Sequence, residues 1–172
     1  GVVPALYLVY ARARAAILEA LGELQASLGE HRPAVASFVR RARLPFPRPA
    51  SELALRLSLA RSLFHTRAPC RGREEAAGAL AFLDARPALG GYRASALDRL
   101  AFAHLTCGEP AEAARRYAEL ERALTGAAGT PINRFKAALA LGSASLAAGE
   151  PAKAAEALRR ARALLDAHPD LE

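Results

Sequence analysis

The 172-residue sequence has no Met and no Trp, two Cys, and an aromatic content of only 6%. It also lacks long runs rich in Val, Ile and Thr, the residue types that favour β-strands. No apolar stretch reaches the roughly 18 residues that a membrane-spanning helix needs. The longest, GVVPALYLVYA, ends before Arg12 and lacks the basic leader of a signal peptide. These absences favour a soluble, all-α protein without a membrane span.

Two cysteines in a chain of this length fit a reducing compartment better than a disulfide framework, so we expect a cytoplasmic location. The chain begins at Gly1 rather than at Met, which suggests a domain excised from a larger protein. Leu171 and Glu172 are interpreted as a cloning scar.

The formal net charge of +7 comes mostly from Arg. A basic surface can bind nucleic acid, but Arg also solvates the outer faces of Ala-rich helices. Few aromatic side chains lie near the Arg clusters to stack on bases, so we do not expect nucleic-acid binding. The clusters are Arg40, Arg41 and Arg43; Arg115 and Arg116; and Arg159, Arg160 and Arg162.

What the chain does contain is Ala and Leu, both good helix formers, arranged in an internal repeat. The stretch CGEPAEAARRYAEL at 107–120 is nearly copied at its start by AGEPAKAAEALRRARALL at 148–165. Looser copies contain Ala34 and Ala76, and the matching alanines Ala34, Ala76, Ala113 and Ala154 are separated by 42, 37 and 41 residues. The spacing indicates four similar units.

Each unit is predicted to be a pair of helices joined by a short turn. Gly29, Gly108 and Gly149 stand where a helix ends on a left-handed residue, and a Pro follows near the start of the next helix. Ser51 and Thr130 are candidate N-caps, and Gly90-Gly91 is expected to form a turn. The expected helices span 4–28, 32–43, 51–66, 73–86, 92–107, 110–125, 131–148 and 151–167.

This pattern resembles the tetratricopeptide repeat (TPR) family, in a divergent form like the extended repeats of some bacterial regulators. The first unit reads LEALGELQASLGEHRPAVASF and the fourth ALALGSASLAAGEPAKAAEALRRA, with small residues at Gly22 and Gly142. Ala101 takes this place in the third unit, and the second unit matches least. Small side chains there allow the second helix to approach the first closely.

The resemblance implies an all-α, right-handed α-α superhelix of about four TPR-like helix pairs. Residues 1–14 would be an N-terminal helical extension or cap. The repeat domain would span 15–170, with repeats at about 15–49, 50–91, 92–130 and 131–169. The apolar start of the chain is expected to cap the first repeat, to pack on a missing domain, or to mediate self-association.

The resemblance further implies a non-enzymatic scaffold that binds a peptide or protein segment in a concave groove lined by first helices. Carried over by position, the groove residues are Glu19, Glu23, Ser27, Ser58, Ser62, His65, Asp98, Phe102, Leu105, Lys136, Ser143 and Leu146. Acidic residues occupy the places of the family's carboxylate-binding Lys and Asn, which suggests a partner of basic or mixed charge. The alternative is a sensor or regulatory module of a larger regulator or kinase.

No motif for phosphate binding, metal-dependent hydrolysis or nucleophilic catalysis is present, so we expect no enzyme activity and no cofactor. His65, Cys70, His104 and Cys107 could form the ligand set of a structural zinc site if the turns of two repeats met. The pairs lack the usual spacing of zinc ligands, and we therefore expect no metal. Glu74, Glu75, Glu119 and Glu121 are interpreted as solvated charges paired along helix faces.

Overall fold

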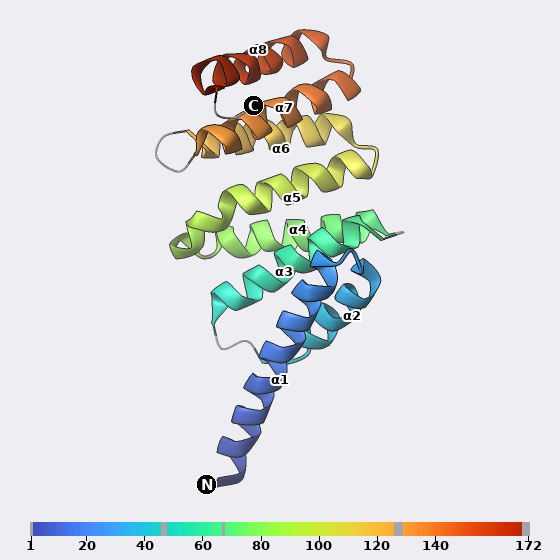
Figure 1. Cartoon of the computed structure of the whole chain (residues 1–172), viewed down its shortest axis with the longest axis vertical. Helices are drawn as coiled ribbons and strands as arrows, with labels where there is room; N and C mark the ends of the chain where they lie inside the picture. Colours follow the sequence, from blue (N-terminus) through green and yellow to red (C-terminus); the bar gives the residue numbers. More distant parts are fainter. Residues whose placement is uncertain (1, 46–47, 67, 126–128, 170–172) are drawn as a thin grey trace. The chain divides into compact units, whose positions relative to one another are not determined.

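A computed structural model describes residues 2–45, 48–66, 68–125 and 129–169 of the chain. Across those residues the structure is helical and has no strand, which confirms the all-α prediction (Figure 1). The elements are α1 (Val2–Ser27), α2 (His31–Ala42), α3 (Pro49–Phe64), α4 (Pro69–Asp84), the 3-10 helix η1 (Pro87–Tyr92), α5 (Arg93–Thr106), α6 (Pro110–Ala123), α7 (Pro131–Ala147) and α8 (Pro151–Ala167).

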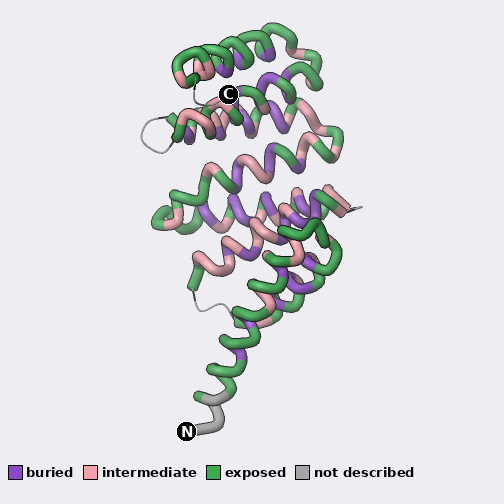
Figure 2. Tube along the Cα trace, viewed as in Figure 1, coloured by how far each residue is buried: buried purple, intermediate pink, exposed green. Residues whose placement is uncertain are grey.

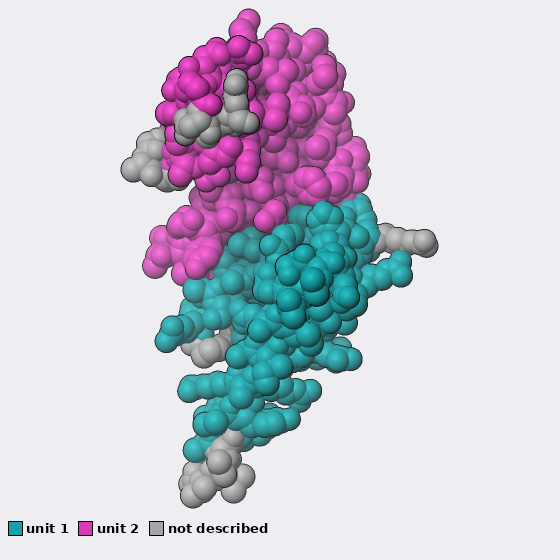
Figure 3. Space-filling model, viewed as in Figure 1, with its two compact units in different colours: residues 1–79 teal, residues 80–172 magenta. Residues whose placement is uncertain are grey.

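The chain divides into two compact units, residues 1–79 and residues 80–172, which Figure 3 colours separately. The first unit contains α1, α2, α3 and most of α4. The second contains the end of α4, then η1 and α5 to α8. Residues 2–14 of the predicted extension belong to the single helix α1, whereas residues 1, 171 and 172 lie outside the described residues.

Three of the helix-pair turns share one backbone geometry. Gly29, Gly108 and Gly149 have φ angles of 79°, 77° and 76°, in the left-handed region that glycine adopts without steric cost. The following Glu N–H then donates to the carbonyl five residues earlier, over 2.8 Å at Glu30 and 2.9 Å at both Glu109 and Glu150. This is the Schellman arrangement, so the predicted helix-ending role of these glycines is confirmed.

The helix pairs are held together by small residues facing large ones. A Cβ added at Gly22 would lie 2.5 Å from the Phe38 ring, and one added at Gly142 would lie 2.7 Å from Leu158. Both glycines are on first helices, and both large residues are on second helices. The four matching alanines Ala34, Ala76, Ala113 and Ala154 are buried. Figure 2 shows that buried and exposed positions alternate along the helices. Close packing explains why these positions stay small.

The second helix pair reverses this arrangement. The large residue, Phe64, lies on the first helix α3, and the small residue, Gly72, lies on the second helix α4, where an added Cβ would overlap the Phe64 ring. The helix α4 also begins at Pro69, earlier than the expected residue 73. The reversal explains why this repeat matches the family pattern least.

Two local predictions were wrong and one is confirmed. The N-cap of α3 is Arg48 rather than Ser51, because Pro49 suits the first helical position and starts the helix earlier. Gly90 and Gly91 lie within the 3-10 helix η1 rather than in an open turn. Thr130 does cap α7, where its Oγ1 accepts a hydrogen bond from the Asn133 N–H over 3.4 Å.

Candidate partner-binding face

The first helices of the second unit, α5 and α7, expose matching faces. Ser95, Asp98, Phe102 and Leu105 recur at helical spacing along α5, and Lys136, Leu139, Ser143 and Leu146 recur along α7. Each residue of the α7 set follows its α5 counterpart by 41 residues, the same separation as Ala113 and Ala154. The two helices therefore present the same face of the repeat, which we call the α5/α7 face.

At the N-terminal ends of α5 and α7 this face contains a cleft of about 190 Å³. Its wall includes Ser95 and Asp98 from α5 and Asn133 and Lys136 from α7, while the apolar Leu120 contributes from α6. The structure thus brings two predicted groove residues, Asp98 and Lys136, into one cleft. Hydroxyl, carboxylate, amide and ammonium groups there can donate and accept hydrogen bonds to a bound chain.

The electrostatics of the cleft centre on Asp98. Partial burial raises the pKa of this carboxyl, and the positive charges of Arg99 and Lys136 oppose the rise. Behind it, burial together with the negative charge of Asp98 raises the pKa of Tyr117 to about 12. The nearest Arg99 nitrogen is 3.5 Å from an Asp98 oxygen, so the carboxylate keeps hydrogen-bonding capacity for another group.

The other end of the α5/α7 face is apolar. Phe102 and Leu139 are 37% and 43% exposed, Leu146 is 63% exposed, and Leu105 is half-buried. Ser143 lies among them with its hydroxyl donating to the Leu139 carbonyl. A partner that covers this face would therefore meet polar groups at one end and apolar side chains at the other.

In the first unit, the predicted acidic groove residues already have basic partners. An oxygen of Glu19 lies 3.6 Å from Arg41 Nε, and Glu23 accepts a hydrogen bond from Arg61 over 2.6 Å. These pairs neutralise the two carboxylates. The argument from Glu19 and Glu23 for a basic partner therefore loses its support.

The remaining predicted residues of the first unit differ in accessibility. Ser62 is fully buried and cannot contact a partner in this conformation, while Ser58 is half-buried. Ser27 is exposed and donates to the Leu24 carbonyl. His65 stacks on His31 with ring centroids 4.3 Å apart, a contact between α2 and the end of α3 that the sequence does not reveal.

Sequence reasoning missed Ser95, Asn133 and Leu139 on the α5/α7 face. The signal was present in the spacing, since Ser95 precedes Lys136 by 41 residues and Leu139 follows Asp98 by the same number. Applying the repeat period to each predicted groove residue would have found two of the three.

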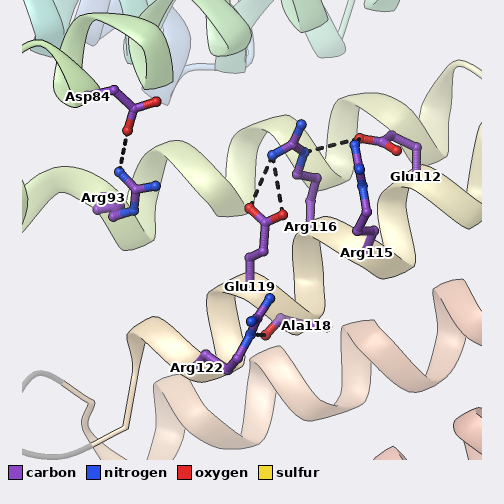
Figure 4. A network of polar contacts seen from close by, with 8 residues as sticks. All are labelled: Asp84, Arg93, Glu112, Arg115, Arg116, Ala118, Glu119 and Arg122. Atoms are coloured by element: carbon purple, nitrogen blue, oxygen red, sulfur yellow. Dashed lines mark hydrogen bonds and ion pairs between the residues drawn. The ribbon is translucent and has the colours of Figure 1, made fainter.

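The Arg clusters of the second helices are largely paired with carboxylates. Figure 4 shows Arg115 and Arg116 on α6 paired with Glu112, and Arg116 also with Glu119. On α8, Arg162 pairs with Asp166. These contacts confirm local pairing at Glu119, and they leave less positive charge for a phosphate backbone than the sequence count suggests.

The hypothetical zinc set finds no support in the structure. His104 Nδ1 lies 2.6 Å from a carboxylate oxygen of Glu109, and neither Cys70 nor Cys107 is a free thiol. Among the described residues, no group of three or more His, Cys, Asp or Glu side chains is placed to hold a metal ion. Because neither cysteine is a free thiol, the cysteine count no longer argues for a reducing compartment.

The helix α1 exposes an apolar stripe that is longer than the expected N-terminal segment. Six large apolar side chains recur at alternating spacings of three and four residues, and Arg14 occupies the one place in this series that is not apolar. The least exposed of the six, Leu21, is 41% exposed. They are Tyr7, Tyr10, Ile17, Leu21 and Leu24 on α1, and Leu28 directly after its end. This is the spacing of a seam between two packed helices. Within the described ranges, no helix is both long and apolar enough to cross a membrane.

Comparisons with known proteins identify the fold. No protein-family model and no curated protein matches the chain. Among solved structures, the chain is similar to BtubC (BKLC) from P. vanneervenii, with a TM-score of 0.52, 16% sequence identity, and coverage of 87% of this chain and 79% of that one. A putative kinesin light chain from Podosopora anserina with nearly identical TPR-like repeats has a TM-score of 0.45 and 18% identity, covering 92% of this chain and 97% of that one.

At these identities the likeness concerns the fold alone. The likeness to BtubC, together with the helix pairs and their glycine turns, confirms the predicted fold: the chain has a TPR-like helical-repeat fold.

Proposed function

We propose that this chain is a non-enzymatic protein-interaction scaffold that binds a peptide or protein segment along the α5/α7 face. The observation that supports it most directly is the matched pair of faces, offset by the repeat period, with Asp98 and Lys136 in one cleft. Binding of a protein partner is also what the resemblance to the TPR family implies, which is consistent with this use of the surface. The partner would have mixed polar and apolar character, since the face has one end of each kind.

The two ends of the face would contribute differently. Phe102, Leu139 and Leu146 would lose water-exposed apolar area to a partner, and such burial supplies most of the affinity of protein interfaces. Asp98 and Lys136 would pair with backbone or charged groups and so fix the position of the bound chain. Ser62 is left out of the proposed surface because it is buried.

A peptide display selection against the intact chain tests this proposal. We expect the selected peptides to bind about 5- to 30-fold more weakly to Phe102→Ala, the effect of losing a partly buried aromatic anchor. Lys136→Glu should also weaken binding. The matched controls are Lys153→Glu, which changes the chain's other lysine, and Tyr92→Ala, which removes an exposed ring from η1. Equal losses in the controls, or no loss in Phe102→Ala, would contradict the proposal.

The stripe on α1 favours a second function, self-association of the chain. Residues from Tyr7 to Leu28 offer a long apolar seam that a second helix could cover. Sedimentation over a range of concentrations should show a dimer of the wild-type chain and a monomer of Leu24→Glu. Tyr92→Glu, which adds the same charge at an exposed ring elsewhere, should behave as the wild type. A wild-type chain that stays monomeric at all concentrations would contradict self-association.

The alternative role as a sensor or regulatory module of a larger regulator or kinase remains a prediction, as does the cytoplasmic location.

A further inference from the structure

A second cleft lies on a different surface of the second unit, where the end of α6, the start of α7 and the later part of α8 meet. It has a volume of about 410 Å³. Three guanidinium groups from three helices line it, together with one carboxylate and an apolar wall. The lining residues that matter here are Glu121 and Arg122 from α6, Arg134 from α7, and Arg160, Ala163 and Leu164 from α8.

Arg160 is held in place by carboxylates of its own chain. Its Nε and Nη2 donate to the two oxygens of Glu121 over 3.2 and 2.7 Å, and its Nη1 donates to Glu156 over 2.9 Å. The contact with Glu121 joins α8 to α6, so it fixes one wall of the cleft. This arginine is a structural member of the site, with its charge already compensated.

The other two arginines are not compensated in this way. Arg122 Nε donates to the Ala118 carbonyl over 3.3 Å, a contact drawn in Figure 4 that leaves its terminal nitrogens available. Neither Arg122 nor Arg134 forms an ion pair with any carboxylate in the described part of the chain. Arg134 also lies in the first turn of α7, where the helix dipole adds positive potential.

The part of the cleft lined by Ala163 and Leu164 is apolar. Ala163 and Leu164 follow one another on α8, and Leu164 is half-buried. A ligand for the whole cleft therefore needs a negative group for the two arginines and an apolar group for α8. Planar guanidinium groups match carboxylates particularly well, because they offer paired N–H donors.

We propose that this cleft binds an acidic peptide segment in which a Glu or Asp side chain stands next to an apolar residue. The carboxylate pairs with Arg122 and Arg134, and the neighbouring apolar side chain packs on Ala163 and Leu164. The site is separate from the α5/α7 face and does not depend on binding there. It gives the second unit a second contact point, one that prefers a negatively charged ligand.

Fluorescence anisotropy with a labelled dodecapeptide of alternating Glu and Leu tests this site on the intact chain. A peptide with Gln in place of Glu is the ligand control, because it keeps the length and the apolar residues. We expect the Glu peptide to bind the wild type and the Gln peptide to bind at least about tenfold more weakly, as expected for loss of a charge-assisted contact. Arg134→Ala should weaken the Glu peptide by a similar factor.

The matched protein control is Arg162→Ala, which removes an exposed arginine of α8 that pairs with Asp166 and does not line the cleft. Binding unchanged in Arg162→Ala but weakened in Arg134→Ala supports the site. Equal weakening in both variants would show a general charge effect and overturn the proposal. Equal binding of the Glu and Gln peptides, no binding of either, or displacement of the Glu peptide by inorganic phosphate at equal concentration would also overturn it.

Discussion

The reversed packing of the second helix pair predicts that two glycines in one helix respond oppositely to the same substitution. Gly72→Ala places a methyl group against the Phe64 ring and 3.0 Å from the Ala60 carbonyl oxygen. Ordinary contacts of a methyl carbon lie at about 3.5–4.0 Å, so the ring and the α3 backbone must both move. Overpacking of this kind costs about 1–3 kcal/mol, while replacing Gly with Ala inside a helix returns up to about 1 kcal/mol.

Because the added methyl meets the α3 backbone as well as the ring, the overpacking cost falls in the upper part of this range, at about 2–3 kcal/mol, and the net expectation for Gly72→Ala is a fall of about 1–2 kcal/mol in the free energy of unfolding. Gly78→Ala is the matched control in the same helix. Its added methyl would meet only a terminal nitrogen of Arg56 at 3.2 Å, and that flexible side chain can move away. This variant should therefore gain up to about 1 kcal/mol from helix propensity.

Urea titrations followed by circular dichroism at the helix band measure both changes. In a Phe64→Leu background, where the ring is gone, Gly72→Ala should cost about 1 kcal/mol less than in the wild type. If Gly72→Ala stabilises the chain as much as Gly78→Ala does, the proposed contact between Gly72 and Phe64 does not constrain the pair and the reasoning is refuted.

Three further outcomes follow from the structure. Burial, and then the nearby charges of His65 and Arg61, lower the pKa of His31 in the folded chain. The contribution of neutral His31 to the free energy of unfolding is therefore fully present above the unfolded pKa of 6.5 and is lost as the pH falls below it. Urea titrations should show a smaller loss in His65→Gln, and an equal loss would contradict this. Gly149→Ala should lower the unfolding free energy by about 1–2 kcal/mol because of the left-handed backbone, and a neutral effect in urea would count against it. Ultraviolet titration should find one tyrosine, Tyr117, ionising at about pH 12, and its loss in Tyr117→Phe checks the assignment.

The helix boundaries could be predicted from the sequence because local residues determine them. Gly149 closes one helix and Pro151 opens the next through their own backbone preferences, whatever the rest of the chain does. The same local logic failed at Ser51, where a competing local signal, Pro49, started the helix earlier. The exchange of large and small residues between Phe64 and Gly72 could not be predicted, since it depends on contact between two helices.

The candidate surfaces, too, could be predicted from the sequence only in part. Asp98 and Lys136 could be placed on one face because helical periodicity and the repeat period fix their positions. The pairing of Arg160 with Glu121, across 39 residues, follows from the packing of α8 on α6 and has no signature in either segment. For that reason the sequence indicated only clusters of arginines, whereas the structure shows which of these arginines are paired with carboxylates.

The exchange between Phe64 and Gly72 also bears on how the chain avoids mispairing its similar helices. Repeat proteins are prone to misassembly because one helix can dock on the wrong neighbour. Phe64 stands at the place that Gly22 takes in the first pair, so a first helix with Phe64 would clash with a second helix that carries Phe38. Whole helix pairs should therefore be exchangeable between positions in a recombined array, whereas single helices should not.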